Sequence, residues 1–151
     1  MGKLITNMSF KRAKNIFFLW LARVLPIQGH LRYKLVKLGG VNIEGPCFIY
    51  SNVRFDTTAP GLITIKKGAV LTRGTAVLTH FLDPSKKGRV FRLAKVTIEE
   101  DVFIGVNVTI CNSVTIGKGA VIGAGSIVTK DIPPYQVWAG NPAHYIKDRV
   151  H

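Results

Sequence analysis

Hydrophobic residues return at every sixth position through residues 95–132 of this chain. An aliphatic side chain occupies each beat of the repeat: Ile98, Ile104, Ile110, Ile116, Ile122 and Val128. A second position, four residues after each beat, holds smaller or β-branched side chains: Val102, Val108, Val114, Ala120 and Ser126. A period of six fits neither the 3.6-residue turn of a helix nor the alternation of a sheet with one wet face. It predicts short parallel strands joined by tight turns, with three strands per coil and each coil stacked on the last.

The core of such a solenoid consists of the stacked beats, because each coil buries its apolar residues only against neighbouring coils. Full burial of one aliphatic side chain contributes about 1.5–3 kcal/mol, so the column of beats is a substantial core. Gly105, Gly117 and Gly123 follow three of the beats, where the chain must turn sharply, and Cys111 takes the same slot in another coil. These glycines are therefore interpreted as turn residues and not as a dinucleotide-binding fingerprint or a phosphate loop.

The six-residue step begins near Val41 and is interrupted twice before the regular stretch. Earlier beats fall in two sets: Ile43, Ile49 and Phe55, and then Ile65, Leu71 and Val77. From Ile43 to Ile65 is 22 residues, four more than a three-strand coil needs, and the excess falls near Pro60-Gly61. From Ile65 to Ile98 is 33 residues, which leaves 15 residues that must leave the solenoid as a loop at about 81–95. Long loops inside a compact repeat are usually functional.

The first 40 residues form a different kind of sequence, with eight Lys or Arg and no acidic residue. A helix is predicted over Ser9–Pro26, with Ser9 as its N-cap and Pro26 as its stop. One apolar stripe runs along this helix: Phe10, Ala13, Phe17, Trp20, Leu21 and Val24. A second helix is predicted over His30–Leu38 and ends at Gly39-Gly40.

Two interpretations of this helical region are compatible, and both stay open. The helices can cap the apolar end of the solenoid, as terminal elements of repeat proteins do. Alternatively, residues 1–26 can lie as a basic amphipathic helix on an anionic inner leaflet. No small-residue cleavage site follows the apolar run, which disfavours a signal peptide. No stretch approaches the roughly 18–20 apolar residues that cross a bilayer.

The repeat stops at Pro133-Pro134, and Asn141-Pro142 is expected to open a short C-terminal helix. The predicted fold is thus an all-β solenoid of about four coils, with an N-terminal helical region, an extruded loop and a C-terminal helix. Three segments follow: residues 1–40 as cap or membrane contact, 41–134 as β-helix, and 135–151 as tail. Cys47 and Cys111 occupy repeat positions and are interpreted as reduced packing residues, which favours a cytoplasmic location.

A formal charge of +13, from 21 basic and 8 acidic residues, indicates anionic partners. Nucleic acid is disfavoured because the chain offers no aromatic platform and no recognition helix. Phosphorylated cofactors and an acidic membrane surface remain as the candidate anionic partners.

His80 is the candidate for proton chemistry, because it lies where a regular coil meets the long basic loop. The loop carries five basic residues against the single acid Asp83: Lys86, Lys87, Arg89, Arg92 and Lys95. A surface histidine at a strand end is the alternative. No second His, Cys or carboxylate lies at ligand spacing from His80, so no metal site is expected.

The segment VIGAGSIVTKDIPP, within residues 41–149, resembles the hexapeptide-repeat acyltransferases. The resemblance is strongest to the branch that acetylates galactosides, maltose, nodulation factors and cell-surface polysaccharides. It implies a trimeric left-handed parallel β-helix that uses acetyl-CoA and no metal. The left hand is implied by the family alone, since the usual crossover rule favours the opposite hand.

By this resemblance His80 is the general base that takes the proton of a sugar hydroxyl as it attacks the thioester, without an acyl-enzyme. Acetyl-CoA would lie in a groove between two subunits. The matching contact positions are Phe103 beside the thioester, Ala124 at the pantetheine, and Thr129, Lys130, His144 and Lys147 towards the nucleotide. His144 and Lys147 stand where relatives carry arginines, and a neutral imidazole is the weaker phosphate partner. Thr129 and Lys130 can also be ordinary turn residues, and Phe103 a packing residue.

Asn52, Asp56 and Asp83 are the candidates for acceptor binding. The apolar, acid-free N-terminal region differs from that of the soluble sugar acetyltransferases, which favours a lipid-linked saccharide at the membrane face as acceptor. The sequence thus predicts an acetyl-CoA-dependent O-acetyltransferase of a carbohydrate hydroxyl, in surface polysaccharide or glycolipid assembly. The alternatives are an N-acetyltransferase of an amino-sugar nucleotide, an antibiotic O-acetyltransferase, and a non-catalytic β-helix scaffold.

Overall fold

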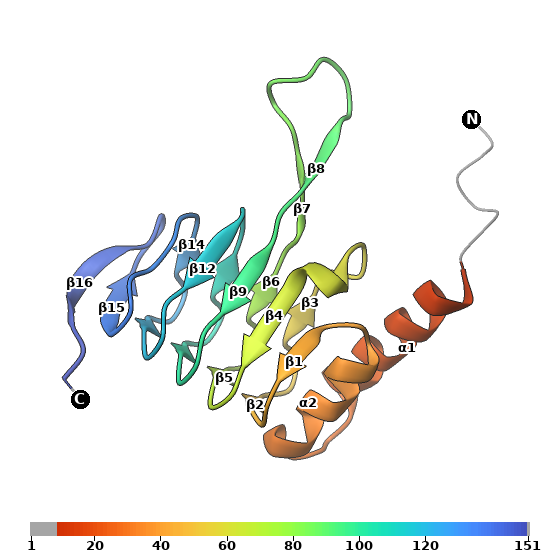
Figure 1. Cartoon of the computed structure of the whole chain (residues 1–151), viewed down its shortest axis with the longest axis horizontal. Helices are drawn as coiled ribbons and strands as arrows, with labels where there is room; N and C mark the ends of the chain where they lie inside the picture. Colours follow the sequence, from red (N-terminus) through yellow and green to blue (C-terminus); the bar gives the residue numbers. More distant parts are fainter. Residues whose placement is uncertain (1–8, 151) are drawn as a thin grey trace.

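Three sheets, parallel except for the last strand of the second, wind around one apolar core in the computed structural model, which describes residues 9–150 (Figure 1). The first sheet has four strands in the order β1 (Asn42–Glu44), β4 (Ile63–Lys66), β9 (Val96–Ile98) and β12 (Val114–Ile116). The third has β3 (Arg54–Phe55), β6 (Ala76–Val77), β11 (Thr109–Ile110) and β14 (Ile127–Val128). The second has β2 (Phe48–Ile49), β5 (Val70–Leu71), β10 (Phe103–Ile104), β13 (Val121–Ile122), β15 (Gln136–Ala139) and β16 (His144–Asp148).

The predicted beats stack directly on one another in all three sheets. Ile98 pairs with Ile65 on one side and with Ile116 on the other, and Ile110 lies between Val77 and Val128. Ten of these side chains have no exposed surface: Ile49, Ile65, Leu71, Val77, Ile98, Ile104, Ile110, Ile116, Ile122 and Val128. The six-residue period therefore predicted the register and the core of the solenoid.

The two excess segments leave the solenoid as short elements of their own. The four extra residues lie in a segment that contains a three-residue 3-10 turn, η1 (Pro60–Leu62). The predicted loop is an antiparallel ribbon of β7 (His80–Leu82) and β8 (Phe91–Leu93), here called the arm (residues 80–93). Figure 1 shows the arm projecting away from the coils.

Two helices precede the first coil, as predicted. Helix α1 (Phe10–Val24) begins at Ser9, whose hydroxyl accepts a hydrogen bond from the Arg12 amide at 3.3 Å. Helix α2 (Gly29–Leu38) ends at Gly39. Leu19, Ala22 and Val36 are buried in the same core as the first coil, so the helices cover this end of the solenoid.

The apolar stripe predicted on α1 is not the face that packs. Phe10, Phe17, Trp20 and Val24 are 87, 53, 54 and 50% exposed, whereas α1 packs through Asn15, Leu19 and Ala22. Apolar residues occur around most of α1, so periodicity alone did not decide which face meets the coils. No described helix is long and apolar enough to cross a bilayer.

The expected C-terminal helix is wrong, because residues 144–148 form strand β16, antiparallel to β15. Strand β15 is the last to add to the second sheet, and its outer edge carries backbone groups that need partners. The chain turns at Asn141-Pro142 and pairs with this edge, which closes the end of the sheet.

The first eight residues of the predicted membrane-contact region lie outside the described residues.

We expect Ile110→Ala to lower the free energy of unfolding by about 2–5 kcal/mol, because it leaves a cavity between two beats of the stack. Val106→Ala is the control, since Val106 is 45% exposed in the neighbouring turn and its change should stay within about 0.5 kcal/mol. Urea denaturation followed by circular dichroism measures both. Equal losses in the two variants would contradict a core built on the stacked beats.

Candidate active site

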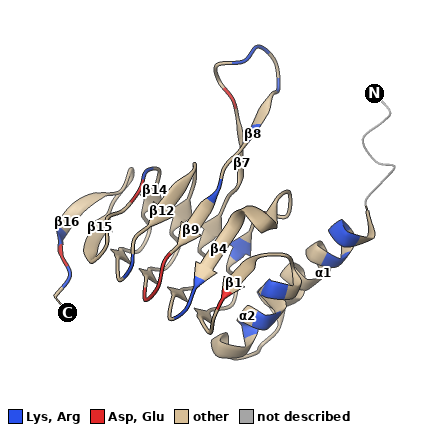
Figure 2. Cartoon of the chain, in the orientation of Figure 1, with Lys and Arg blue, Asp and Glu red and all other residues tan. Residues whose placement is uncertain are grey.

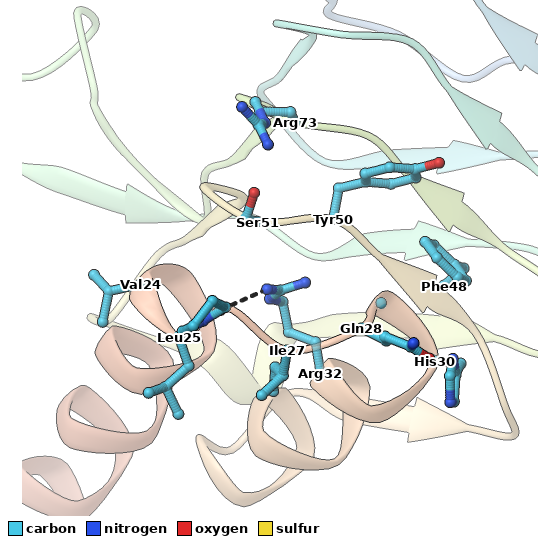
Figure 3. Close-up of a pocket in the computed structure, with 12 residues that line it drawn as sticks. Val24, Leu25, Ile27, Gln28, His30, Arg32, Phe48, Tyr50, Ser51 and Arg73 are labelled. Atoms are coloured by element: carbon cyan, nitrogen blue, oxygen red, sulfur yellow. Dashed lines mark hydrogen bonds between the residues drawn. The ribbon is translucent and has the colours of Figure 1, made fainter.

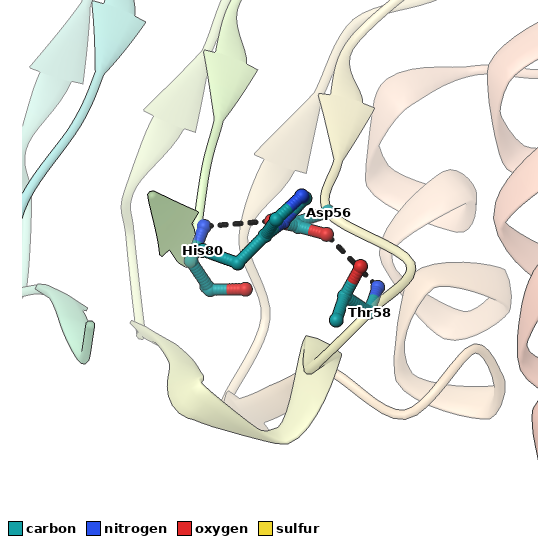
Figure 4. A network of polar contacts seen from close by, with 4 residues as sticks. Asp56, Thr58 and His80 are labelled. Carbon is teal, nitrogen blue, oxygen red and sulfur yellow. Dashed lines mark hydrogen bonds and ion pairs between the residues drawn. The ribbon is translucent and has the colours of Figure 1, made fainter. Parts of the chain in front are cut away.

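His80 is the first residue of β7, at the base of the arm, and its side chain is 40% exposed. Its Nδ1 atom lies 2.5 Å from Oδ2 of Asp56, the residue that follows β3 in the coil below (Figure 4). The Phe91 ring of the arm lies against the imidazole, with 5.8 Å between ring centroids. His80 is thus fixed on one side and open on the other.

Asp56 is held as an anion by hydrogen bonds from the backbone. Its side chain is 3% exposed, and its two oxygens accept from the amides of Thr58 and Thr79, each at 2.9 Å. Burial by itself raises the pKa of Asp56, but the Thr79 and Thr58 amides and His80 outweigh burial and lower the pKa to about 2. At neutral pH the carboxylate is therefore ionised.

The ionised carboxylate determines which nitrogen of His80 is free to act. A carboxylate only accepts hydrogen bonds, so Nδ1 of His80 carries the proton that Asp56 accepts. In the neutral imidazole Nε2 is then the unprotonated nitrogen, available to take a proton from an acceptor. This arrangement can perform general base catalysis.

Sequence reasoning placed Asp56 in the acceptor group and missed its pairing with His80. The register carried the signal, because Phe55 pairs with Val77 in adjacent strands. Asp56 follows the first of these residues directly, and His80 lies three residues beyond the second. Stacking the two coils would have placed both residues at the same corner.

The other two acceptor candidates lie apart from this pair. Asn52 is in the turn between β2 and β3, where its side-chain oxygen accepts from Nε of Arg23 at 3.1 Å. Asp83 lies in the arm, where its Oδ1 accepts from the amide and the hydroxyl of Ser85 at 3.0 and 2.6 Å. Both side chains are thus engaged in local structure, and the structure brings neither of them to His80.

A chain of hydrogen bonds connects the arm with the predicted cofactor position Thr129. Arg92 in β8 donates to the side-chain oxygen of Asn112 at 3.1 Å, and the Asn112 amide donates to the Thr129 carbonyl at 3.3 Å. His80 and Thr129 therefore belong to the same edge of the solenoid, spanned by Asn112.

The remaining predicted cofactor positions are spread over the later coils. Phe103 begins β10 and is 41% exposed, and Ala124 is exposed in the turn after β13. Lys130 lies over the Trp138 ring, with its Nζ 5.1 Å from the ring centroid. His144 and Lys147 are exposed on β16. The six positions are thus distributed over β10, the turns that follow β13 and β14, and β16.

Neither cysteine is suited to nucleophilic chemistry. Burial raises the pKa of Cys47 to about 12, and burial also raises the pKa of Cys111. Within residues 9–150 there is no group of three or more His, Cys, Asp or Glu that could hold a metal ion.

Comparison with known proteins links the repeat to a family and the fold to acetyltransferases. Residues 95–130 match the family model described as the hexapeptide repeat of succinyl-transferase. A 2,3,4,5-tetrahydropyridine-2,6-dicarboxylate N-acetyltransferase from Brevibacillus brevis is 52% identical over 52 residues, which are 34% of this chain and 22% of that protein. The chain thus spans less than a quarter of the length of this curated relative.

Solved structures resemble the chain over nearly its whole length. A hexapeptide-repeat containing acetyltransferase from Vibrio cholerae has a TM-score of 0.75 and 26% identity, over 93% of this chain and 92% of that one. A galactoside acetyltransferase in complex with coenzyme A has a TM-score of 0.69 and 28% identity, over 97% and 86%. These likenesses show that the chain has the fold of hexapeptide-repeat acetyltransferases, which implies a left-handed β-helix.

Asp56→Asn is expected to lower the stability of the fold in a pH-dependent way. The pKa of Asp56 is about 2 in the folded state against about 3.9 for a free side chain. The ionised carboxylate therefore adds to the free energy of unfolding in full above about pH 4, and this stabilisation is lost as the pH falls through 2. Urea denaturation at several pH values from 7 to 3 should show the deficit of the variant shrinking towards low pH. A deficit that is the same at every pH would contradict an ionised Asp56.

Proposed function

Because the chain is a hexapeptide-repeat protein that resembles acetyltransferases of this class along most of its length, we propose that it transfers the acetyl group of acetyl-CoA to a carbohydrate hydroxyl. The observation that carries the proposal is the pairing of His80 with Asp56, which leaves one imidazole nitrogen free for a proton. Neither a non-catalytic scaffold nor a packing role needs an ionised carboxylate behind a half-exposed histidine.

The proposed reaction uses His80 as base and then as acid. Nε2 of His80 takes the proton of the acceptor hydroxyl while the hydroxyl oxygen attacks the thioester carbonyl carbon. The carbon–sulfur bond then breaks, the acetyl group stays on the oxygen, and the leaving sulfur takes the proton from the imidazolium. Asp56 acts as a positioning residue that orients the ring and stabilises the imidazolium between these steps.

We propose that the enzyme works as a homotrimer. Leu82, Phe91 and Leu93 of the arm are 51, 58 and 61% exposed, so the arm carries an apolar surface that another copy of the chain can cover. The six cofactor positions, which one chain keeps apart, would then form a cleft together with positions of a neighbour. In that cleft the charges of Lys130 and Lys147 suit the phosphates of acetyl-CoA, and His144 can add a hydrogen bond.

A carbohydrate acceptor is favoured by the extent of the likenesses. The galactoside acetyltransferase structure resembles 97% of this chain with a TM-score of 0.69, which supports a sugar hydroxyl as the acceptor. Acylation of an amine is the alternative, and it would use the same base. We propose an acceptor in the assembly of surface polysaccharide or glycolipid.

We further propose that the helical end rests on an anionic membrane at its cytoplasmic face, where a lipid-linked acceptor would be reached. The exposed stripe of α1, consisting of Phe10, Phe17, Trp20 and Val24, is the surface that supports this. Lys and Arg residues dominate the charge of both helices, and neither helix has an acidic residue (Figure 2). Apolar burial and attraction to anionic lipid would act together.

His80→Ala should reduce turnover by about 10²–10⁴-fold, the usual contribution of a general base. Release of free CoA thiol, measured with galactoside and maltoside acceptors, reports the rate. Stabilisation by acetyl-CoA should be retained, about 2.7 kcal/mol at 100 times Kd, because the base does not hold the donor. Undiminished turnover in the variant would remove His80 from the mechanism.

Phe17→Asp combined with Trp20→Asp should abolish sedimentation with phosphatidylglycerol vesicles, since it places two charges on the exposed stripe. Val150→Asp is the matched control, because Val150 is 95% exposed at the opposite end of the solenoid. Sedimentation with phosphatidylcholine vesicles, which carry no net charge, shows how much of the membrane binding depends on electrostatic attraction. If the double variant sediments like the control, α1 is not the contact surface.

A further inference from the structure

A groove of about 510 Å³ lies where α1 passes into α2, against the second sheet and the turn that follows β5. Phe48 and Tyr50 form an aromatic wall, with 5.0 Å between their ring centroids. Its polar side chains also include those of Gln28, His30, Arg32, Ser51 and Arg73, and no acidic residue lines it. The groove is separate from the His80–Asp56 pair, since it shares no residue with that site.

Arg32 is a buried cation whose partners in the chain are all neutral. The residue is 3% exposed, and its guanidinium donates to the carbonyl oxygens of Ala22, Leu25 and Ile49 at 2.7, 2.7 and 3.1 Å. Among the described residues no carboxylate forms an ion pair with it. A buried charge without a counter-charge is unfavourable, and an anion in the groove would relieve it.

Arg73 adds a second positive charge across the same space. Figure 3 shows Arg73 on one side of the groove and Arg32 on the other, with the Ser51 hydroxyl between them. Burial and the charge of Arg73 lower the pKa of Arg32, so the two guanidinium groups are close enough to repel each other. Two like charges that face one space without a carboxylate form a surface complementary to an anion.

The N-terminus of α2 is a third feature of the groove that favours an anion. Gln28 provides no side-chain cap, and the first turn of the helix, at Gly29 and His30, lines the groove. A Cβ at Gly29 would lie 2.3 Å from the Phe48 ring, so glycine lets the helix start directly against the aromatic wall. The positive end of the helix dipole thus adds to the two arginines.

We propose that this groove binds a phosphate or carboxylate group of one of the two substrates, with Arg73 and Arg32 on the anion and the Phe48–Tyr50 wall beside the rest of the molecule. This rests on the proposed acetyl transfer for the identity of the ligand, although not for the binding of the anion. The two possible sources are an acidic or phosphorylated saccharide acceptor and the phosphates of acetyl-CoA, and the second source would replace the phosphate position proposed above at Lys130, His144 and Lys147.

Arg73→Gln is the variant to test, because Arg73 is exposed, whereas a change at Arg32 would also release α1 and α2 from β2. Sodium phosphate, compared with sodium chloride at equal ionic strength, should raise the melting temperature of the unmodified protein and not that of the variant. Arg54→Gln, the same change at an exposed arginine of β3 outside the groove, should keep the response. Arg73→Lys should restore part of it, since the charge is retained.

Steady-state kinetics then identifies the source of the anion. In Arg73→Gln the KM should rise about ten- to a hundred-fold for the substrate that carries it, with kcat unchanged, the loss expected for a charged hydrogen bond. A rise for an acidic acceptor and not for its neutral analogue identifies the acceptor, and a rise for acetyl-CoA identifies the donor.

Two results would overturn the proposal. A phosphate response that is equal in Arg73→Gln and in the unmodified protein would exclude the groove as an anion site. A response that is lost while both KM values stay unchanged would exclude a role in binding substrate. Because the thermal measurement needs no turnover, a failure of the proposed acetyl transfer would be seen separately from a failure of the anion site.

Discussion

The stacking register of successive coils is the constraint on which the rest of the structure depends. Each aliphatic beat lies in a strand that pairs with the corresponding strand of the next coil. Residues in excess of the six-residue step can therefore leave the coil only at a corner between two strands. Both excesses leave at the same corner of the first two coils. Asp56 lies just before the 3-10 turn at Pro60–Leu62, and His80 opens the arm. The two departures from the repeat thereby create the place where a carboxylate and an imidazole meet.

The repeat was predictable because its period is imposed by the geometry of the coil and is visible in the sequence. The ends were not, because a terminal coil has no neighbour that imposes the period. At one end β16 pairs with the free edge of β15, where a helix was expected from Asn141-Pro142. At the other end, apolar residues on several sides of α1 left its packing face undecided. The sequence singled out His80 as a candidate base, but it did not predict the pairing of His80 with Asp56, since their contact joins residues 24 positions apart.

Asp56 shows how the fold keeps a buried charge in a very basic chain. Backbone amides of Thr58 and Thr79 solvate the carboxylate in place of water, so it remains ionised while nearly inaccessible. Two of the other acids have ordinary partners, as in the ion pairs Lys66–Glu99 and Lys118–Glu100 at the turns of the first sheet. The carboxylate of Asp56 is thus a buried partner of the imidazole and not a surface charge.

The distribution of positive charge follows from the same division between coils and appended segments. Acids are interspersed among the lysines of the coil turns, whereas α1 and α2 carry basic residues only and the arm carries one acid, Asp83, against four basic residues (Figure 2). Arg32 sits at the junction of the two regions, because its guanidinium binds α1, the turn after it and β2 at once. The contacts that fasten the helices to the solenoid therefore also place a cation in the wall of the groove. Closing the apolar end of the core and forming a positively charged recess are two results of one packing arrangement.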